Sequence, residues 1–505
     1  MGMTRRDALK GAGAAMVGMT GLGAATPLAA ADPFGYLSHD ALGLAALVRS
    51  RQVSASELLE TAIGRAEDAN QRIDFMAQKL YAHGRGAVAN RLHDGLFCGV
   101  PFLIKDLNCH IEGTRSGQGS RLYNDYIAPQ TSELVRRHQA AGLVIFGKTA
   151  TPEFGLTGTT ESIATGATRN PWNLAHSAGG SSGGAAAAVA AGVVPIAHAS
   201  DGGGSIRIPA SCCGLFGIKP SRGRIPMGPG RTEGWGGLST NGAISRSVRD
   251  SAAMFDATAG LEPGSRYGAP SPDGSFLSQC EREPGALRIA LMLEPISGSP
   301  IDPEIIAATR ATARLCEMLG HHVTEASFRF DAARLGQANF AVIATAMAAD
   351  VDARAAAAGL TVGPDVLEPI TLGFYQVGKS MSGTDVARAH ATLQEAAIAS
   401  ANFMADYDVI LSPTLARPPA PLGELDLNHA DFAAWGQRVS TYSPFTGLYN
   451  ATGQPSMSVP RAMSATGLPL GMMFTARYGE EALLIRLAAQ LERAQPWRGL
   501  APGVV

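Results

Sequence analysis

The stretch SAGGSSGGAAAAVAAG, residues 177–192, places two adjacent serines, Ser181 and Ser182, between pairs of glycines at the start of an alanine-rich run. The glycines alone are compatible with a solvent linker or with a catalytic loop. The apolar run 185–199, however, predicts a buried helix followed by a strand. Such a unit returns the chain to the edge of the sheet where ligands of open α/β sheets gather. The paired serines are therefore expected at that edge.

A second glycine-rich loop with a serine follows in ASDGGGSIRIPA (199–210). Gly202, Gly203 and Gly204 lead directly into Ser205. Because glycine adopts positive φ at little cost, successive N–H groups of such a run can point the same way. The resulting nest suits an anion, or a carbonyl oxygen that becomes one during acyl transfer. Two tight turns with incidental serines are the alternative.

A serine nucleophile needs a proton acceptor, and a lysine is available to supply it. Only six of the 41 basic residues are lysines, and Lys105 stands at the end of the apolar strand predicted in GVPFLIKD (99–106). Burial favours the neutral amine, so the pKa of Lys105 is expected to be lowered. An ordinary surface lysine is the alternative, which the apolar residues 100–104 argue against.

Of three familiar motifs, two are matched only in letters and the third is not matched. GLVIFGKT (142–149) fits a phosphate-binding loop, but its apolar middle predicts a buried strand with Lys148 at its end. GGSSG (179–183) fits the nucleophile elbow of α/β hydrolases, yet the segment before it, 170–178, reads as a polar loop rather than the apolar strand that an elbow requires. No serine stands three residues before any lysine, which excludes S-x-x-K chemistry. All three interpretations are therefore rejected.

Helical and strand-like patterns alternate along the chain. Helices are predicted at 38–50, 54–70, 131–142 and 303–320, and strands at 99–106, 143–148 and 407–414. Ser38 is predicted to cap the first helix, and Ser54 and Glu57 to form a capping box on the second. The alternation predicts an α/β fold with a mixed, mostly parallel central sheet covered by helices on both faces. The Pro/Gly/Ser-rich stretch 262–279 is predicted to be a long loop within one domain.

The composition excludes several classes of partner. With a net charge of −2 and a pI near 6.6, nothing favours binding to nucleic acid or to an anionic membrane surface. The six cysteines have no CxxC or zinc-finger spacing, so we expect free thiols, no disulfide framework and no metal site. Adjacent Cys212 and Cys213 are expected to pack beside the serine loops.

The first 31 residues indicate an export signal. Arg5 and Arg6 precede a Gly/Ala run, which is followed by small residues suited to cleavage near Ala30 or Ala31. This pattern resembles a bacterial twin-arginine signal, with a disordered basic tail as the alternative. No later stretch has 18 continuous apolar residues. We therefore expect a periplasmic or secreted protein that has no membrane segment after signal removal.

GVPFLIKD, SAGGSSGG and DGGGSIRIPASCCGLFGIKPSRGRIP (201–226), at these spacings, resemble the amidase signature family. The likeness extends from about residue 36 to the C-terminus, includes NATGQPSMSVP (450–460), and is weakest over 263–400. GATRNPWNL and PIAHASDGGGSIRIPAS are most similar to a branch that contains a cyclic-amide hydrolase. The resemblance implies one catalytic domain over 32–505. Its parts are a helical N-terminal part (36–95), a core (96–262), a loop-rich variable region (263–400) and a return to the core (401–500).

The resemblance assigns the reacting groups by position. Ser205 matches the nucleophile, Lys105 the base, and Ser181 the relay serine, whose peptide bond is cis in this family. The implied oxyanion hole is formed by the backbone N–H groups of Gly202, Gly203, Gly204 and Ser205. No cofactor or metal is required.

Three further residues are expected to support this site. Ser182 is expected to hydrogen-bond beside Ser181, while Asp201 and Arg207 are expected to brace the second loop rather than react. One position departs from the family, whose members usually carry a bulkier residue where this chain has Gly202. The oxyanion loop is therefore expected to be looser here.

The expected activity is hydrolysis of a carbon–nitrogen bond in a small linear or cyclic amide, through an acyl-enzyme on Ser205. A carbamate or aryl-amide hydrolase of the same family is the alternative. The export signal argues against a glutamine-hydrolysing amidotransferase subunit. A catalytically dead exported binding protein would require the three reacting residues to coincide by chance. Residues 330–380 and 415–450 are expected to line the substrate pockets, and a homodimer is compatible with the sequence.

Overall fold

A buried helix and a buried strand join the two glycine-rich loops. The computed structural model describes residues 32–90, 92–228, 230–497 and 499–502; the predicted export signal, 1–31, lies outside these ranges. Helix α5 (Gly183–Ala190) begins directly after the paired serines, and strand β8 (Ile196–Asp201) leads into the second loop. Every residue of both elements is buried. The predicted succession of helix and strand is confirmed.

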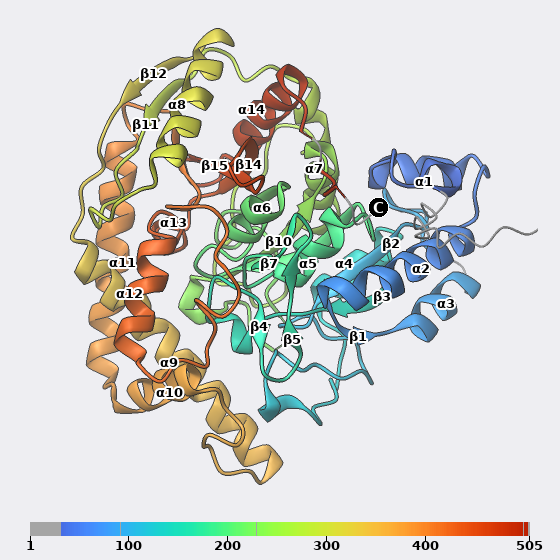
Figure 1. The fold of residues 1–505 in the computed structure, drawn as a ribbon, viewed down its shortest axis with the longest axis horizontal. Coiled ribbons are helices and arrows are strands. Elements are labelled where there is room, and N and C mark those ends of the chain that lie inside the picture. The colour runs from blue at the N-terminus through green and yellow to red at the C-terminus, as the bar shows by residue number, and fades with distance from the viewer. Residues whose placement is uncertain (1–31, 91, 229, 498, 503–505) are drawn as a thin grey trace, which may run out of the picture. The chain divides into compact units, whose positions relative to one another are not determined.

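β8 lies inside an eleven-stranded sheet, the largest that the described residues form (Figure 1). In spatial order its strands are β1 (Met76–Lys79), β3 (Val144–Thr149), β2 (Pro101–Lys105), β8, β10 (Thr240–Ser245), β9 (Phe216–Lys219), β14 (Ser456–Met463), β15 (Pro469–Ala476), β13 (Val409–Pro413), β11 (Arg288–Leu291) and β12 (His322–Glu325). Two short ribbons are separate from it: β4 (Glu161–Ser162) with β5 (Gly166–Ala167), and β6 (Arg169–Asn170) with β7 (Asn173–Ser177).

The sheet is mixed, as predicted. β2 pairs in parallel with β3 and β8, and β11 pairs in parallel with β12 and β13. The run from β8 through β10, β9, β14 and β15 to β13 is antiparallel, as is β1 against β3. Antiparallel neighbours can be joined by short connections, such as 464–468 between β14 and β15. The alternation of helices and strands therefore describes the parallel groups better than the middle of the sheet.

Fourteen α-helices in the described ranges cover both faces of the sheet (Figure 1). They are α1 (Ala41–Arg49), α2 (Ala55–Ile73), α3 (Tyr81–Ala89), α4 (Glu133–Ala140), α5, α6 (Arg207–Cys213), α7 (Val248–Thr258), α8 (Pro303–Met318), α9 (Ala332–Ala358), α10 (Pro369–Ser380), α11 (Gly383–Phe403), α12 (Phe432–Tyr442), α13 (Thr446–Ala451) and α14 (Glu481–Ala494). The predicted capping box of α2 is present: Ser54 Oγ accepts the N–H of Glu57, and the Glu57 carboxylate accepts the N–H of Ser54. No described helix combines the length and apolar character that crossing a membrane requires.

Two local predictions are wrong. α1 is capped by Asp40 rather than Ser38, because the Asp40 carboxylate stands next to the first helical residue and accepts the N–H of Gly43 at 2.9 Å. The segment 170–178, predicted as a polar loop, contains the partly exposed strand β7, which pairs with the short strand β6. GLVIFGKT does form the buried strand β3, and Lys148 is its second-last residue, one position from the predicted end.

Candidate active site

Lys105 lies at the carboxyl end of β2, beside the carboxyl end of its parallel neighbour β8. Its side chain is fully buried. Its Nζ lies within hydrogen-bond distance of three hydroxyl oxygens: Ser181 Oγ at 2.7 Å, Ser182 Oγ at 3.0 Å and Ser200 Oγ at 3.1 Å. The fold therefore brings the lysine and the paired serines together across 76 residues of chain.

Burial controls the protonation of Lys105. Desolvation lowers the pKa of Lys105 to about 7, and the negative charge of Asp201 opposes this shift without cancelling it. Its three partners are neutral hydroxyls, and no carboxylate in the described ranges forms an ion pair with it. The amine is therefore available in its neutral form near neutral pH, the form that can accept a proton.

Ser200 belongs to this network and was not predicted. Ser182 Oγ donates to the carbonyl oxygen of Ser200 at 3.1 Å, which ties the paired-serine loop to β8. Side chains alternate between the two faces of a strand, so His198 and Ser200 lie on one face of IAHASD. Both contact Lys105, since the Lys105 N–H donates to His198 Nδ1 at 3.2 Å. Strand alternation, applied to β8, is the signal that could have found them.

The glycines before Ser181 are required by close backbone packing. A Cβ on Gly180 would lie 2.2 Å from the carbonyl oxygen of Thr159, and Gly179 has a left-handed φ of +80°. The peptide bond between Gly180 and Ser181 is cis, as the resemblance implies. Gly155 approaches from another segment, where a Cβ would lie 3.0 Å from Ser181 Oγ. The loop is thus tightly packed on several sides, which excludes a solvent linker.

A buried ion pair shapes the second loop. Arg207 Nη2 and Nε donate to the two carboxylate oxygens of Asp201 at 2.9 and 3.0 Å. Burial alone would raise the pKa of Asp201, but the Arg207 guanidinium outweighs burial and holds this pKa well below its usual range. The carboxylate also accepts the N–H groups of Gly204 at 2.8 Å and Ile206 at 3.0 Å. It therefore fixes the backbone on both sides of Ser205.

This arrangement changes the predicted oxyanion hole. The N–H of Gly204 is committed to Asp201, so it does not point at a substrate oxygen. The N–H groups of Gly202, Gly203 and Ser205 do not donate to the Asp201 carboxylate. The candidate oxyanion hole therefore has three N–H donors rather than four, because the N–H of Gly204 is hydrogen-bonded within the loop.

The same loop is held by residues from near the end of the chain. Arg207 Nη1 donates to the carbonyl oxygen of Thr446 at 2.9 Å, and Thr446 Oγ1 donates to that of Gly203 at 2.6 Å. Asn450 Nδ2 donates to the carbonyl oxygen of Asp201 at 3.1 Å. Both partners belong to α13, which therefore supports the loop from behind.

Ser181 and Ser205 line one pocket, which we call the inner pocket. Ser205 Oγ makes no hydrogen bond within the described part of the chain, so it is free to attack a substrate. The other lining residues are Leu107, Asn108, Gln118, Phe154, Gly155, Ser200, Gly202, Arg231, Gly234, Trp235, Ser239, Met347 and Asp350.

Backbone strain is concentrated around the inner pocket. Asn108, Gln118, Phe154 and Trp235 have φ of 60°, 52°, 52° and 47°, in the left-handed region that side chains rarely adopt. They are four of the seven described non-glycine residues with positive φ. Such strain persists where surrounding structure enforces it, most often at functional sites. The clustering is a second observation, besides the serines, that makes this pocket the candidate active site.

The predicted pocket lining is only partly correct. From 330–380, α9 contributes Met347 and Asp350, but none of the lining residues comes from the described residues 415–450. Thr446 and Asn450 bond instead to the carbonyl oxygens of Gly203 and Asp201 and do not line the inner pocket. The wall that the sequence did not predict is the segment 231–239.

Trp235 fills the space left by Gly202. A Cβ on Gly202 would lie 2.6 Å from Cζ3 and 2.7 Å from Cε3 of the indole. The predicted looseness of the oxyanion loop is therefore not observed, because an aromatic ring from another segment replaces the missing side chain. The indole also packs against buried residues around Leu238, which holds it in place.

Gly202→Ala is expected to lower kcat/KM about tenfold or more, because the added methyl group displaces either the indole or the oxyanion loop. Steady-state kinetics on any hydrolysed amide measures the effect. Gly203→Ala is the matched comparison and should cost less, since a Cβ there meets nothing within 4 Å. Adding Trp235→Ala to Gly202→Ala should recover part of the loss; a double variant as poor as the single one would contradict the steric explanation.

A neutral histidine lies behind Lys105. His198 Nε2 is 3.3 Å from Asn241 Oδ1, and Cys109 Sγ is 3.5 Å from the imidazole. Since Nδ1 accepts the N–H of Lys105, the proton is on Nε2, which donates to Asn241. Burial lowers the pKa of His198 to about 3 and raises that of Cys109 to about 12. This trio therefore holds β2 in place and is not itself a nucleophilic site.

The cysteines are unpaired, as predicted. Of the six, Cys98 and Cys280 are half-buried and the others are buried. Cys212 and Cys213 pack beside the paired-serine loop: Cys213 Sγ lies 3.4 Å from the carbonyl oxygen of Ala178. Among the described residues, no group of three or more His, Cys, Asp or Glu side chains is arranged to hold a metal ion.

The fold and this pocket agree with one enzyme family. A family model described as Amidase matches residues 57–485. The chain belongs to the amidase signature family, and it is a hydrolase that acts on the carbon–nitrogen bonds of amides. The predicted resemblance and fold class are confirmed.

The chain is similar to several individual members of this family. The 6-aminohexanoate-cyclic-dimer hydrolase of Paenarthrobacter ureafaciens is 37% identical over 480 residues, which are 92% of this chain and 97% of that protein. A structure of 6-aminohexanoate cyclic dimer hydrolase complexed with substrate has a TM-score of 0.88 at 36% identity, covering 93% of this chain and 99% of that chain. A bacterial aryl acylamidase has a TM-score of 0.83 at 27% identity, covering 91% and 96%.

Proposed function

We propose that this amidase hydrolyses a small, uncharged linear or cyclic amide through an acyl-enzyme on Ser205, with Lys105 as the base and Ser181 as the proton relay. One observation carries the proposal. The buried amine of Lys105 is 2.7 Å from Ser181 Oγ, and Ser181 shares the inner pocket with Ser205. Base, relay and nucleophile are thus grouped at the end of one sheet.

The proton path follows from the bonding capacity of the amine. A neutral amine has two N–H donors and one lone pair, yet three hydroxyls surround Lys105 Nζ. One hydroxyl must therefore donate to the nitrogen, and Ser181 has the shortest contact. As Ser181 gives its proton to Lys105, its oxygen takes the proton of Ser205, whose oxygen attacks the carbonyl carbon.

The rest of the cycle uses the same groups in reverse. The carbonyl oxygen becomes negative in the tetrahedral intermediate, where the N–H groups of Gly202, Gly203 and Ser205 can stabilise it; one such donor is worth about 3 kcal/mol. The C–N bond breaks as Lys105, through Ser181, returns the proton to the leaving nitrogen. Water then attacks the ester on Ser205 by the same relay, which releases the acid and restores the hydroxyl.

The lining of the inner pocket supports uncharged substrates. Leu107, Met347, Phe154 and Trp235 supply apolar walls, and the charged Arg231 and Asp350 are paired with each other. The relatives named as cyclic-dimer hydrolases support a cyclic amide. An aryl amide is the second candidate, favoured by the two aromatic side chains and by the likeness to an aryl acylamidase.

Mass spectrometry with a substrate panel tests this function. The purified protein is incubated with a linear amide, a cyclic amide, an anilide and a carbamate, and is then acid-quenched and digested. We expect an acyl mass increment on the peptide that contains Ser205, with at least one of the amides hydrolysed. Ser205→Ala serves as the control and should carry no increment. Hydrolysis without a Ser205 adduct in single-turnover quenches, or an adduct on another residue, would contradict the mechanism.

A further inference from the structure

The side chain of Arg222 bonds to backbone carbonyl oxygens rather than to a carboxylate. Its Nε donates to the carbonyl oxygen of Gly237 at 2.5 Å, and its Nη2 donates to those of Asn450 at 2.9 Å and Ala451 at 2.8 Å. The residue is half-buried, and within the described ranges it forms no ion pair. Its charge is therefore stabilised by carbonyl dipoles, as is common for a cation at the C-terminus of a helix.

The three carbonyl oxygens belong to the ends of two short helical elements. Gly237 is the last residue of the 3-10 helix η5 (Trp235–Gly237), and Asn450 and Ala451 are the last two residues of α13. The last carbonyl groups of a helix have no partner within that helix, so they are available to an outside donor. Arg222 therefore joins η5 to α13 through a single guanidinium.

Both of these elements contact the oxyanion loop, 202–205. Trp235 of η5 lies over Gly202, where a Cβ would be 2.6 Å from the indole. From α13, Asn450 Nδ2 donates to the carbonyl oxygen of Asp201 at 3.1 Å, at the start of the loop. The oxyanion loop is thus held by the same two elements that Arg222 joins.

The arginine is held along both its backbone and its side chain. A Cβ on Gly237, which has φ of +89°, would lie 3.2 Å from Arg222 Cδ, and a Cβ on Gly453, which has φ of +77°, would lie 3.3 Å from Arg222 Cζ. The N–H of Arg222 donates to the carbonyl oxygen of Gly453 at 3.0 Å, and its own carbonyl accepts the hydroxyl of Tyr478 at 2.7 Å. The guanidinium is therefore preorganised against its carbonyl partners.

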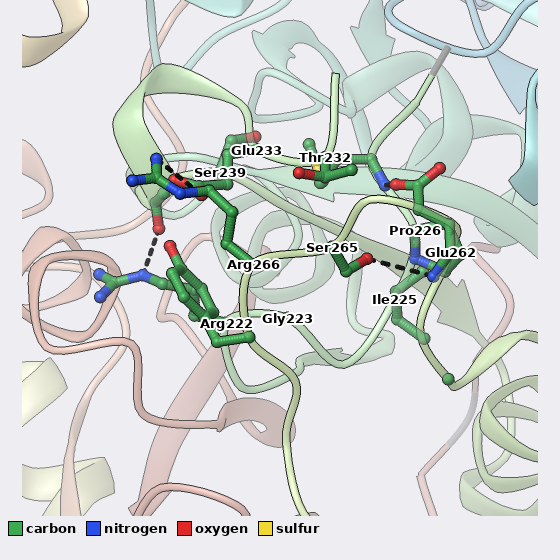
Figure 2. Close-up of a pocket in the computed structure, with 14 residues that line it drawn as sticks. Arg222, Gly223, Ile225, Pro226, Thr232, Glu233, Ser239, Glu262, Ser265 and Arg266 are labelled. Carbon is green, nitrogen blue, oxygen red and sulfur yellow. Dashed lines mark hydrogen bonds and ion pairs between the residues drawn. The ribbon is translucent and has the colours of Figure 1, made fainter. Parts of the chain in front are cut away.

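Figure 2 shows the small pocket beside η5 that Arg222 lines. Here Arg266 is paired with Glu233 at 3.4 Å, and a Cβ on Gly237 would lie 2.9 Å from the hydroxyl of Tyr267. The side chain of Arg266 is 76% exposed, and ion pairs of exposed side chains contribute little to stability. Among these charged side chains, Arg222 is the one whose bonds connect η5 with α13.

We propose that Arg222 is a positioning residue for the hydrolysis: by joining η5 to α13, it holds the indole of Trp235 against Gly202 and keeps the N–H donors of the oxyanion loop aligned. A donor displaced from the developing oxyanion stabilises the transition state less, whereas binding of the uncharged substrate is little affected. The inference rests on the proposed function, because it requires that the loop around Ser205 stabilise a tetrahedral intermediate.

Arg222→Met is expected to lower kcat about tenfold to a hundredfold and to change KM less than about threefold. The loss is partial because the bond from Asn450 Nδ2 to the carbonyl oxygen of Leu238, at 3.0 Å, still connects α13 to the residue after η5. Arg222→Lys keeps the charge but has one ammonium for two elements, so its kcat should lie between those of the native protein and Arg222→Met. Steady-state kinetics on a hydrolysed amide gives both constants, and urea unfolding shows whether each variant is folded.

A double-mutant cycle with Trp235→Ala separates positioning from a general loss of stability. If Arg222 acts through the indole, Arg222→Met should lower kcat by less than about threefold once Trp235 is replaced. An equal loss in the two backgrounds overturns the inference. If Arg222→Met does not fold, the same cycle with Arg222→Lys decides between these two results.

Arg137→Met is the matched control. Arg137 also donates to a row of carbonyl oxygens, those of residues 258–261 at the end of α7, but it does not line the inner pocket. Its replacement should lower the free energy of unfolding and leave kcat unchanged. An acyl adduct on Ser205 of the native protein, together with an unchanged kcat in Arg222→Met, overturns this inference alone. Hydrolysis without such an adduct overturns the proposed function and this inference with it.

Discussion

Replacing Ser205 with alanine is expected to lower kcat by about 10,000-fold or more on every amide that the native protein hydrolyses. The variant loses the only atom to which the acyl group would bond, while Lys105 and Ser181 keep their contact. The substitution removes a single oxygen that has no hydrogen-bond partner in the described part of the chain. The free energy of unfolding should therefore change little, and substrate binding should survive.

Stopped-flow and steady-state kinetics measure the loss of kcat, and equilibrium dialysis with a slowly hydrolysed amide measures substrate binding. Ser182→Ala is the matched control: the same atom is removed from a neighbouring serine that contacts Lys105 but lies outside the set of lining residues. A loss of less than about a hundredfold in Ser205→Ala, with Ser182→Ala equally impaired, would mean that Ser205 is not the nucleophile.

Lys105→Met is expected to lower kcat by about 100-fold to 10,000-fold, the usual contribution of a positioned base. Methionine has a similar length and an apolar end, so the buried space stays filled, but the lone pair is lost. The pH profile of the native protein provides a second readout. Because burial lowers the pKa of Lys105 to about 7, kcat should rise with pH below 7 as the ammonium loses its proton. It should level off above that pH, where the amine is neutral.

Lys219→Met is the matched control for this prediction. Lys219 is also buried with a pKa lowered to about 7, first by desolvation and then by Arg207, but it donates to the carbonyl oxygen of Pro220 and does not line the inner pocket. Its replacement should leave the shape of the kcat profile unchanged. A rise near pH 7 that persists in Lys105→Met would assign the titration to another group and remove Lys105 from the mechanism.

The sequence predicted the elements that depend on short-range patterns. The helix and strand between the two glycine-rich loops are set by a continuous apolar run, so α5 and β8 could be placed without knowledge of the rest of the fold. Lys105 could be found for the same reason. A lysine that directly follows a run of apolar residues is expected at the end of the strand that this run forms. The family motifs then linked these segments.

What could not be predicted depends on contacts between distant segments. The indole of Trp235 occupies the space above Gly202, and no local pattern relates two residues on separate loops. The commitment of the Gly204 N–H to Asp201 likewise depends on how the carboxylate turns once Arg207 is paired. The prediction that 415–450 lines the pocket was wrong for a related reason. Thr446 and Asn450 of α13 bond to the carbonyl oxygens of Gly203 and Asp201, and the composition of the segment does not reveal these contacts.

The bonds from α13 to the serine loop have a consequence for the newly made chain. Arg207, Asp201 and Gly203 are synthesised some 240 residues before Thr446 and Asn450, which hold them in position. A nascent polypeptide that stops short of α13 contains Lys105, Ser181 and Ser205, but it lacks the bonds from Thr446 and Asn450 that hold the carbonyl oxygens of Gly203 and Asp201. Truncated products of the gene that end before α13 are therefore expected to be inert, although they contain every proposed reacting group.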